Sequence, residues 1–271
     1  MTQAGVDADS DAVVSRIEGR VGTVVLNRPE ARNALSPELT DALITQVRAL
    51  DRDPQVKCIV LRGQGDNFSA GGDVKSFNQA LALSPEQRHA QFEKRLLVGS
   101  RLPNVILQTN KPVIVVTQGA VAGAGLALAL AADFTVCAAS SYFIAAHVHV
   151  GLSLDVGLSR LLVETIGIKQ AKRLALLGER IDATQALALG LVTEVVSDES
   201  VDEVVHKLIV RLSSGPQRAM QGSKQLLNAV AYAGLDGQLA DEARHIAACT
   251  AEADFEEGVR AMLEKRRPRF A

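Results

Sequence analysis

Hydrophobic positions in the first fifty residues change from the period of a strand to the period of a helix. Residues 13–18 and 21–26 alternate or run apolar on either side of a Gly-Arg pair, which predicts a hairpin. The Ser-Pro-Glu triplet at residues 36–38 supplies a helix cap and a proline at the first helical position. Apolar residues then recur at helical spacing as far as residue 50. The sequence therefore predicts a hairpin followed by an amphipathic helix.

Beyond residue 57, short apolar runs alternate with helical patterns up to about residue 200. Strands are predicted over residues 57–62, 113–117, 134–138, 142–145 and 191–196. Helices are predicted from residue 74, from 84 to about 101, and over 123–132. Strand and helix units in this order favour parallel strands joined by crossover helices. We therefore predict an α/β core domain over residues 1–200 and a helical C-terminal subdomain over residues 201–271.

Two glycine-rich turns are the most informative local feature. Residues 68–73 (FSAGGD) and 119–125 (GAVAGAG) each follow a predicted strand and open a predicted helix. Helix N-termini carry unpaired N–H groups and a partial positive charge, so two of them that converge would stabilise an oxyanion. The alternative is that both segments are ordinary strand-to-helix turns.

Composition and charge exclude several classes of protein. A chain of 271 residues with 47% hydrophobic and 22% charged residues, a net charge of -2 and an estimated pI near 6.2 gives no reason to expect a nucleic-acid or membrane partner. The apolar stretch 118–133 is shorter than the roughly 20 residues that a membrane span needs. Residues 1–11 are polar and acidic, which predicts no signal or transit peptide. Together with three isolated cysteines, this favours a cytoplasmic protein.

Five segments together carry a family resemblance that covers nearly the whole chain. They are residues 26–35 (LNRPEARNAL), the first glycine turn, the second turn with its helix as far as Asp133, residues 190–192 (GLV), and residues 255–258 (FEEG) with Phe270. In these segments the chain resembles the enoyl-CoA hydratase/isomerase family, the crotonases. The resemblance implies the crotonase-like spiral of strand and helix units that ClpP shares. It also implies an acyl-CoA thioester as substrate, with coenzyme A as part of the substrate and no separate cofactor, and assembly into homotrimers or hexamers.

The same resemblance assigns an oxyanion hole and a binding site for coenzyme A. The two amides of the hole fall on Ala70 and Ala124, and alanine at the second position departs from the usual glycine. The residues expected to contact the substrate or its coenzyme A portion are Arg28, Ala31, Arg32, Ser69, Gly71, Gly72, Asp73, Val74, Gly123 and Lys265. Each of the basic residues could equally be a solvated surface charge.

The carboxylates depart further from the family pattern. Hydratases of the family use two glutamates to position water, and the matching positions here are Ala127 and His147. Asp155 stands where the resembling isomerases place an acidic proton carrier. Because hydration needs both an activated nucleophile and a proton donor, we expect isomerisation of an enoyl-CoA through a dienolate instead. The alternative for Asp155 is a helix N-cap, since a helix is predicted to begin just after it.

Two histidines close to Asp155 in sequence are candidate functional residues, and two further functions are compatible with the sequence. His147 and His149 would face the same side of an extended segment, but no third ligand is close in sequence, so no metal site is expected. His147 is interpreted as a base or hydrogen-bond donor, or else as a structural polar residue. Asp155 could also act as the nucleophile of a dehalogenase or hydrolase, as in aryl-CoA dehalogenases. The chain could also bind acyl-CoA without catalysis.

Overall fold

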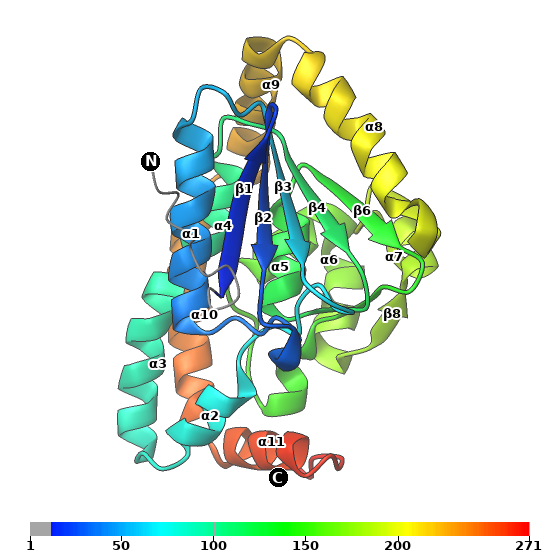
Figure 1. Cartoon of the computed structure of the whole chain (residues 1–271). Coiled ribbons are helices and arrows are strands. Elements are labelled where there is room, and N and C mark those ends of the chain that lie inside the picture. The colour runs from blue at the N-terminus through cyan, green and yellow to red at the C-terminus, as the bar shows by residue number, and fades with distance from the viewer. Residues whose placement is uncertain (1–11, 100, 271) are drawn as a thin grey trace, which may run out of the picture.

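A six-stranded sheet lies at the centre of the molecule (Figure 1). The computed structural model describes residues 12–99 and 101–270, so the expectation for residues 1–11 lies outside the described part. The strand order is β1-β2-β3-β4-β6-β9, with β1 antiparallel to β2 and all other pairs parallel. The strands are β1 Val13–Glu18, β2 Val21–Leu26, β3 Cys58–Gly63, β4 Val113–Thr117, β6 Phe134–Ala138 and β9 Glu194–Val196. The predicted hairpin and parallel core are both confirmed.

A second, smaller sheet lies beside the glycine turns. It contains β5 Ala120–Ala122, β7 Tyr142–Ile144 and β8 Arg180–Asp182, in the order β5-β7-β8. β5 pairs with β7 in parallel. This pairing fixes the second glycine turn, because β5 runs directly into the helix that the turn opens.

Helices surround both sheets. They are α1 Pro37–Arg52, α2 Val74–Ala80, α3 Pro85–Gly99, α4 Arg101–Leu107, α5 Ala124–Ala131, α6 Leu158–Leu177, α7 Ala183–Leu189, α8 Val201–Ser214, α9 Gln217–Ala231, α10 Leu235–Thr250 and α11 Ala253–Leu263. Short 3-10 helices are η1 Pro29–Ala31, η2 Ala146–Val150 and η3 Asp198–Ser200. No helix in the described ranges is both long and apolar enough to cross a bilayer.

Each face of the six-stranded sheet has its own core. Side chains alternate across a strand, so Ile59 and Leu61 of β3 pack with α1, α4, α5 and α6, whereas Cys58 and Val60 pack with α8 on the opposite face. Burial on both faces explains the continuous apolar runs of the parallel strands.

A third cluster forms at the end of the molecule where α2, α3, α10 and α11 gather (Figure 1). Three rings form its centre: Phe77, Phe92 and Phe255 have centroids 5.6 to 6.1 Å apart in tilted or edge-on arrangements. Contacts of this kind are favourable for aromatic rings. The cluster joins helices on both sides of residue 200, and the proposed division there stays a prediction.

The sequence predictions missed the short strands β5 and β8, and the structure differs from the predictions in two further places near the site. The helix predicted from residue 84 to about 101 is α3, and α4 follows it as a second, separately defined helix. Residues 146–150, which were expected to be extended, form the 3-10 helix η2. The second difference changes the directions of His147 and His149.

Candidate functional site

The two glycine turns are packed against each other. Gly71 has φ +85°, and a Cβ there would lie 2.7 Å from the Ala122 carbonyl oxygen and 3.3 Å from the Gly123 Cα. No side chain fits into that space, so glycine at position 71 is what lets the turns approach. Asp73 caps α2 by accepting the Lys75 N–H at 3.0 Å. The predicted convergence of the two turns is confirmed.

A cavity of about 480 Å³ opens at this junction, and we call it the turn cavity. It is lined by most of the predicted site residues, namely Ala31, Arg32, Ala70, Gly72, Asp73, Val74, Gly123, Ala124, His147 and Asp155. Four predicted residues do not line it: Arg28, Ser69, Gly71 and Lys265. The Ser69 side chain is instead buried and donates to the Asn33 carbonyl at 2.8 Å, and Lys265 is exposed beyond the end of α11.

The two amides predicted to form an oxyanion hole differ in their availability. Ala124 is the first residue of α5, where an amide has no acceptor within the helix, and no acceptor outside the helix is found for it in the described part of the chain. The Ala70 N–H donates to the Arg32 carbonyl at 2.9 Å. The prediction that both amides are free is therefore wrong for this conformation.

The backbone conformation of Arg32 explains the occupied amide. Arg32 follows η1 with φ 51° and ψ 39°, and Asn33 also has a positive φ of 54°. The buried Asn33 amide nitrogen holds this bend by donating to the Gln64 carbonyl at 2.9 Å and the Asn67 carbonyl at 2.7 Å. Left-handed backbone at non-glycine residues is uncommon and costs free energy. The sequence carries no local signal that would place this carbonyl against Ala70.

Asp155 and His147 form a hydrogen-bonded pair inside the turn cavity. The His147 Nε2 and the Asp155 Oδ1 lie 2.8 Å apart. His147 is only 8% exposed, and its buried Nδ1 has no hydrogen-bond partner in the described part of the protein. A doubly protonated imidazole would leave that N–H unpaired, so the arrangement favours a neutral ring that donates its Nε2–H to an Asp155 carboxylate.

The cap alternative for Asp155 is wrong, because its side chain contacts His147 and another carboxylate caps α6. Glu242 of α10 accepts the Gly157 N–H at 2.6 Å and the Ser159 N–H at 3.0 Å. Between Asp155 and this cap, Val156 has φ 47°, which is a strained value for a β-branched residue. Glu242 therefore holds the strained segment that presents Asp155.

Sequence reasoning missed Glu242, although a signal existed. Glu242 follows Leu239 by three residues and precedes Ile246 by four, so it lies on the apolar face of its helix, and it is 5% exposed. A carboxylate is rarely fully buried without partners. Its presence among buried apolar positions indicates a specific structural role.

We expect Glu242→Gln to lower kcat by about 10- to 100-fold with little change in KM, because a shift of about 1 Å in a reacting group costs on this scale. The amide keeps one acceptor for the two N–H groups and loses the other. Steady-state kinetics on the substrate proposed below measures both constants. An unchanged kcat would show that the segment keeps its position without the carboxylate.

The Glu242 carboxyl also gives stability a pH dependence. Burial raises its pKa above the usual 4.5, against the opposing effect of the two N–H donors. The folded protein then binds this proton more tightly than the unfolded chain does. The stability contributed by this group is fully present below about pH 4.5 and is lost as the pH rises through the raised pKa. Glu242→Gln removes this component from the pH profile of unfolding.

His149 does not share the environment of His147. In η2 the two side chains diverge, and the His149 Nε2 donates to the Gly178 carbonyl at 2.8 Å. The expectation that both rings face one side is wrong because a 3-10 helix replaces the extended backbone. In the described ranges no three His, Cys, Asp or Glu side chains gather as metal ligands would.

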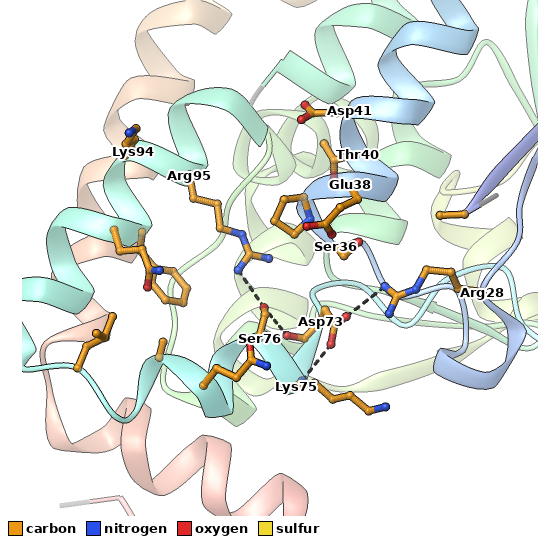
Figure 2. A pocket seen from close by; sticks show the side chains of 17 residues that line it. Arg28, Ser36, Glu38, Thr40, Asp41, Asp73, Lys75, Ser76, Lys94 and Arg95 are labelled. Atoms are coloured by element: carbon orange, nitrogen blue, oxygen red, sulfur yellow. Dashed lines mark hydrogen bonds and ion pairs between the residues drawn. The ribbon is translucent and has the colours of Figure 1, made fainter. Parts of the chain in front are cut away.

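Arg28 is held by the protein itself. Its Nη1 lies 3.1 Å from the Asp73 Oδ2 (Figure 2) and 3.1 Å from the Ala34 carbonyl oxygen. Asp73 thus caps α2 and pairs with a cation at the same time. Of the two carboxylates that line the turn cavity, only Asp155 is without an arginine or lysine partner in the described part of the chain.

Comparisons with known proteins agree over nearly the whole chain. A family model described as enoyl-CoA hydratase/isomerase matches residues 16–271. The chain is 34% identical over 265 residues to 1,2-epoxyphenylacetyl-CoA isomerase of Escherichia coli strain K12, covering 95% of this chain and 97% of that protein. It is 31% identical over 262 residues to trans-2-decenoyl-(acyl-carrier-protein) isomerase of Streptococcus mutans, covering 97% and 98%.

A solved structure of a protein named as an enoyl-CoA hydratase is also similar to this chain. The crystal structure of an enoyl-CoA hydratase from Mycobacterium avium subsp. paratuberculosis K-10 matches with a TM-score of 0.86 at 31% identity. The match covers 96% of this chain and 98% of that one. Similar proteins thus carry both isomerase and hydratase names.

Proposed function

Because the chain belongs to the enoyl-CoA hydratase/isomerase family, we propose that it moves the double bond of an enoyl-CoA thioester, with Asp155 as the proton carrier. The predicted crotonase-like fold is confirmed by the solved relatives. The observation that carries the proposal is the Asp155–His147 hydrogen bond in the turn cavity, beside the amide of Ala124. One positioned carboxylate is sufficient for a proton shift.

The reaction follows from the partners of Asp155. The carboxylate removes a proton from the carbon next to the thioester carbonyl, and the electron pair moves into a dienolate whose oxygen accepts the Ala124 N–H. The same proton then returns from Asp155 to the carbon two positions away, and the double bond ends in conjugation with the carbonyl. The His147 Nε2–H fixes one carboxylate oxygen and leaves the other for the proton.

The second amide becomes available by exchange of acceptors. The thioester oxygen would replace the Arg32 carbonyl as the acceptor of the Ala70 N–H. Loss of one such donor typically costs about 3 kcal/mol of transition-state stabilisation. The exchange gives the developing negative charge a stronger interaction with the amide than the neutral carbonyl has.

Hydration is disfavoured by the side chains at the two hydratase positions. Ala127 lies in α5 at 1% exposure and offers no polar group, and His147 is engaged by Asp155. A water molecule added across the double bond would need a second acid or base in this place.

Spectroscopy of purified protein tests the function. A 3-enoyl-CoA is expected to be converted to its 2-enoyl isomer, which is followed by the ultraviolet absorbance of the conjugated thioester. In heavy water, deuterium should enter the product only to the extent that the proton on Asp155 exchanges with solvent before it returns to the substrate. Formation of a 3-hydroxyacyl-CoA from a 2-enoyl-CoA at a comparable rate would overturn the proposal in favour of hydration.

A second candidate uses the same Asp155–His147 contact. In a dehalogenase, the carboxylate would form an aryl ester as halide departs; in a hydrolase, it would form a mixed anhydride with the acyl group as the coenzyme A thiolate departs, and water would then cleave either intermediate. Trapping of an adduct on Asp155, observed by mass spectrometry of the intact chain, would favour this candidate. Isomerisation forms no bond between the chain and its substrate.

The proposed partner besides the acyl-CoA is the chain itself, as a homotrimer or hexamer. Exposed apolar side chains support this proposal: on α9, Leu226, Leu227 and Val230 are 74%, 71% and 81% exposed. An apolar patch of this kind is typical of an interface between subunits.

A further inference from the structure

Arg95 of α3 is a partly buried cation that lines two cavities, an inner and an outer one. Its guanidinium lies 5.8 Å from the centroids of Phe77 and of Phe92, and its Nη1 donates to the Ser76 Oγ at 2.9 Å. No ion pair to it is found among the described residues. The proposed proton transfer makes no use of this cation.

The inner of the two cavities joins Arg95 to the reacting groups. This inner pocket has a volume of about 60 Å³ and is lined by residues that include Ala124, Asp155, Phe77 and Arg95. Ala124 and Asp155 also line the turn cavity, so the inner pocket continues from the place where the thioester carbonyl would lie. Its volume equals about two water molecules at roughly 30 Å³ each. Only a short stretch of acyl chain fits between Asp155 and Arg95.

Arg95 also lines the outer cavity, which measures about 960 Å³ and whose lining side chains are drawn in Figure 2. In Figure 2 the Arg95 guanidinium points toward Ser76, opposite Glu38 and Ser36. Four basic side chains and three carboxylates line this cavity: Arg28, Lys75, Lys94 and Arg95, and Glu38, Asp41 and Asp73. Arg28 already pairs with Asp73, whereas Arg95, the only one of these four cations that also lines the inner pocket, forms no ion pair in the described part of the chain.

Burial of the Arg95 guanidinium favours the binding of an anion to it. Loss of water around the Arg95 guanidinium lowers its pKa, and the carboxylates of Asp155, Asp73 and Glu38 act in the opposite direction. An arginine keeps its charge in such a place. Its planar donors match a carboxylate, which binds them through two parallel hydrogen bonds.

We propose that Arg95 selects acyl-CoA substrates whose short acyl chain ends in a carboxylate, with the thioester at Ala124 and the far carboxylate on the guanidinium. This inference rests on the proposed function only in placing the thioester in the turn cavity. The positive charge of the guanidinium acts on both the substrate carboxylate and Asp155, so it offsets the repulsion between the two. A methyl-ended chain of the same length offers the guanidinium no carboxylate to bind.

Calorimetric titration with two saturated thioesters tests the selection without any turnover. The probes are adipyl-CoA, which ends in a carboxylate, and hexanoyl-CoA, which has the same number of carbons and ends in a methyl group. We expect adipyl-CoA to bind the wild-type protein at least about tenfold more tightly, which corresponds to about 1.4 kcal/mol. Arg95→Met is expected to remove this preference, and Arg95→Lys to keep part of it.

Arg48→Met is the matched control, because Arg48 is exposed on α1 and lines neither cavity. It removes the same charge and should keep the preference. Equal affinities of the two probes for the wild-type protein, or an unchanged preference in Arg95→Met, would overturn the inference. If adipyl-CoA is preferred through Arg95 but no enoyl-CoA is isomerised, the selection stands and the proposed function fails.

Discussion

Asp155→Asn is expected to lower kcat for isomerisation of a 3-enoyl-CoA by about 1000-fold, within the 10²- to 10⁴-fold range of general acid–base catalysis. Asparagine keeps the size of the side chain and can still accept the His147 Nε2–H, but it cannot take up a proton. KM should change little, since the amide preserves the shape of the turn cavity. Stopped or continuous ultraviolet assays of the conjugated product give both constants.

His147→Gln distinguishes the proton transfer by Asp155 from the hydrogen bond that His147 donates to it. The glutamine amide can donate to Asp155 in place of the ring, so the carboxylate keeps a hydrogen bond and we expect a loss of only about tenfold in kcat. A larger loss in His147→Gln than in Asp155→Asn would mean that the histidine, and not the aspartate, carries the proton. Thermal unfolding of both variants should resemble that of the wild-type protein, which shows that each variant is folded.

Lys224→Met is expected to lower the free energy of unfolding by about 3–5 kcal/mol, the cost of breaking a buried ion pair by removing one partner. The Lys224 Nζ lies 2.7 Å from the Asp133 Oδ2 and also donates to Thr109 and to the carbonyls of Ile106 and Lys111. Its side chain is 8% exposed. Removing the ammonium leaves these acceptors without their donor. Urea denaturation measures the change.

Lys207→Met is the control for that prediction. Lys207 also pairs with a carboxylate, Glu203, four residues earlier on α8, but both side chains are about 70% exposed. Exposed pairs are screened by water and contribute little. We expect no measurable shift of the denaturation midpoint. Equal losses in the two variants would contradict the view that burial gives the Lys224 pair its importance.

Much of the fold near the site could be predicted from local patterns. The Ser36 cap and the following proline predict the start of α1, and the Ser36 Oγ accepts the Leu39 N–H at 3.3 Å in the structure. Gly71 and Gly123 have positive φ values, so the glycines already marked the two turns. Such features depend on neighbours within a few residues, and they can therefore be recognised without the rest of the chain.

Other features depend on contacts between distant segments. The family resemblance placed Ala70 in an oxyanion hole, yet its amide is occupied by the Arg32 carbonyl, whose direction depends on a bend held by Asn33. The environment of Arg95 likewise requires α2 and α3 to pack together. Its helix carries Arg88, Phe92 and Arg95 on one face, but periodicity alone does not show which cation lies beside a cavity.

By itself, the sequence determined the hairpin over residues 13–26, the alternation of strands and helices in the core and the position of two small-residue turns, and its family resemblance marked one aspartate where a proton carrier is expected. It did not indicate the short strands β5 and β8 or the separate helix α4. The tertiary structure decided which of these groups are available: it paired Asp155 with His147, occupied the Ala70 amide, and brought Glu242 to the Gly157 amide from 85 residues away. Backbone propensity and hydrophobic period act over a few residues. Hydrogen-bond partners and burial arise only when distant segments pack, and these set the chemistry of the site.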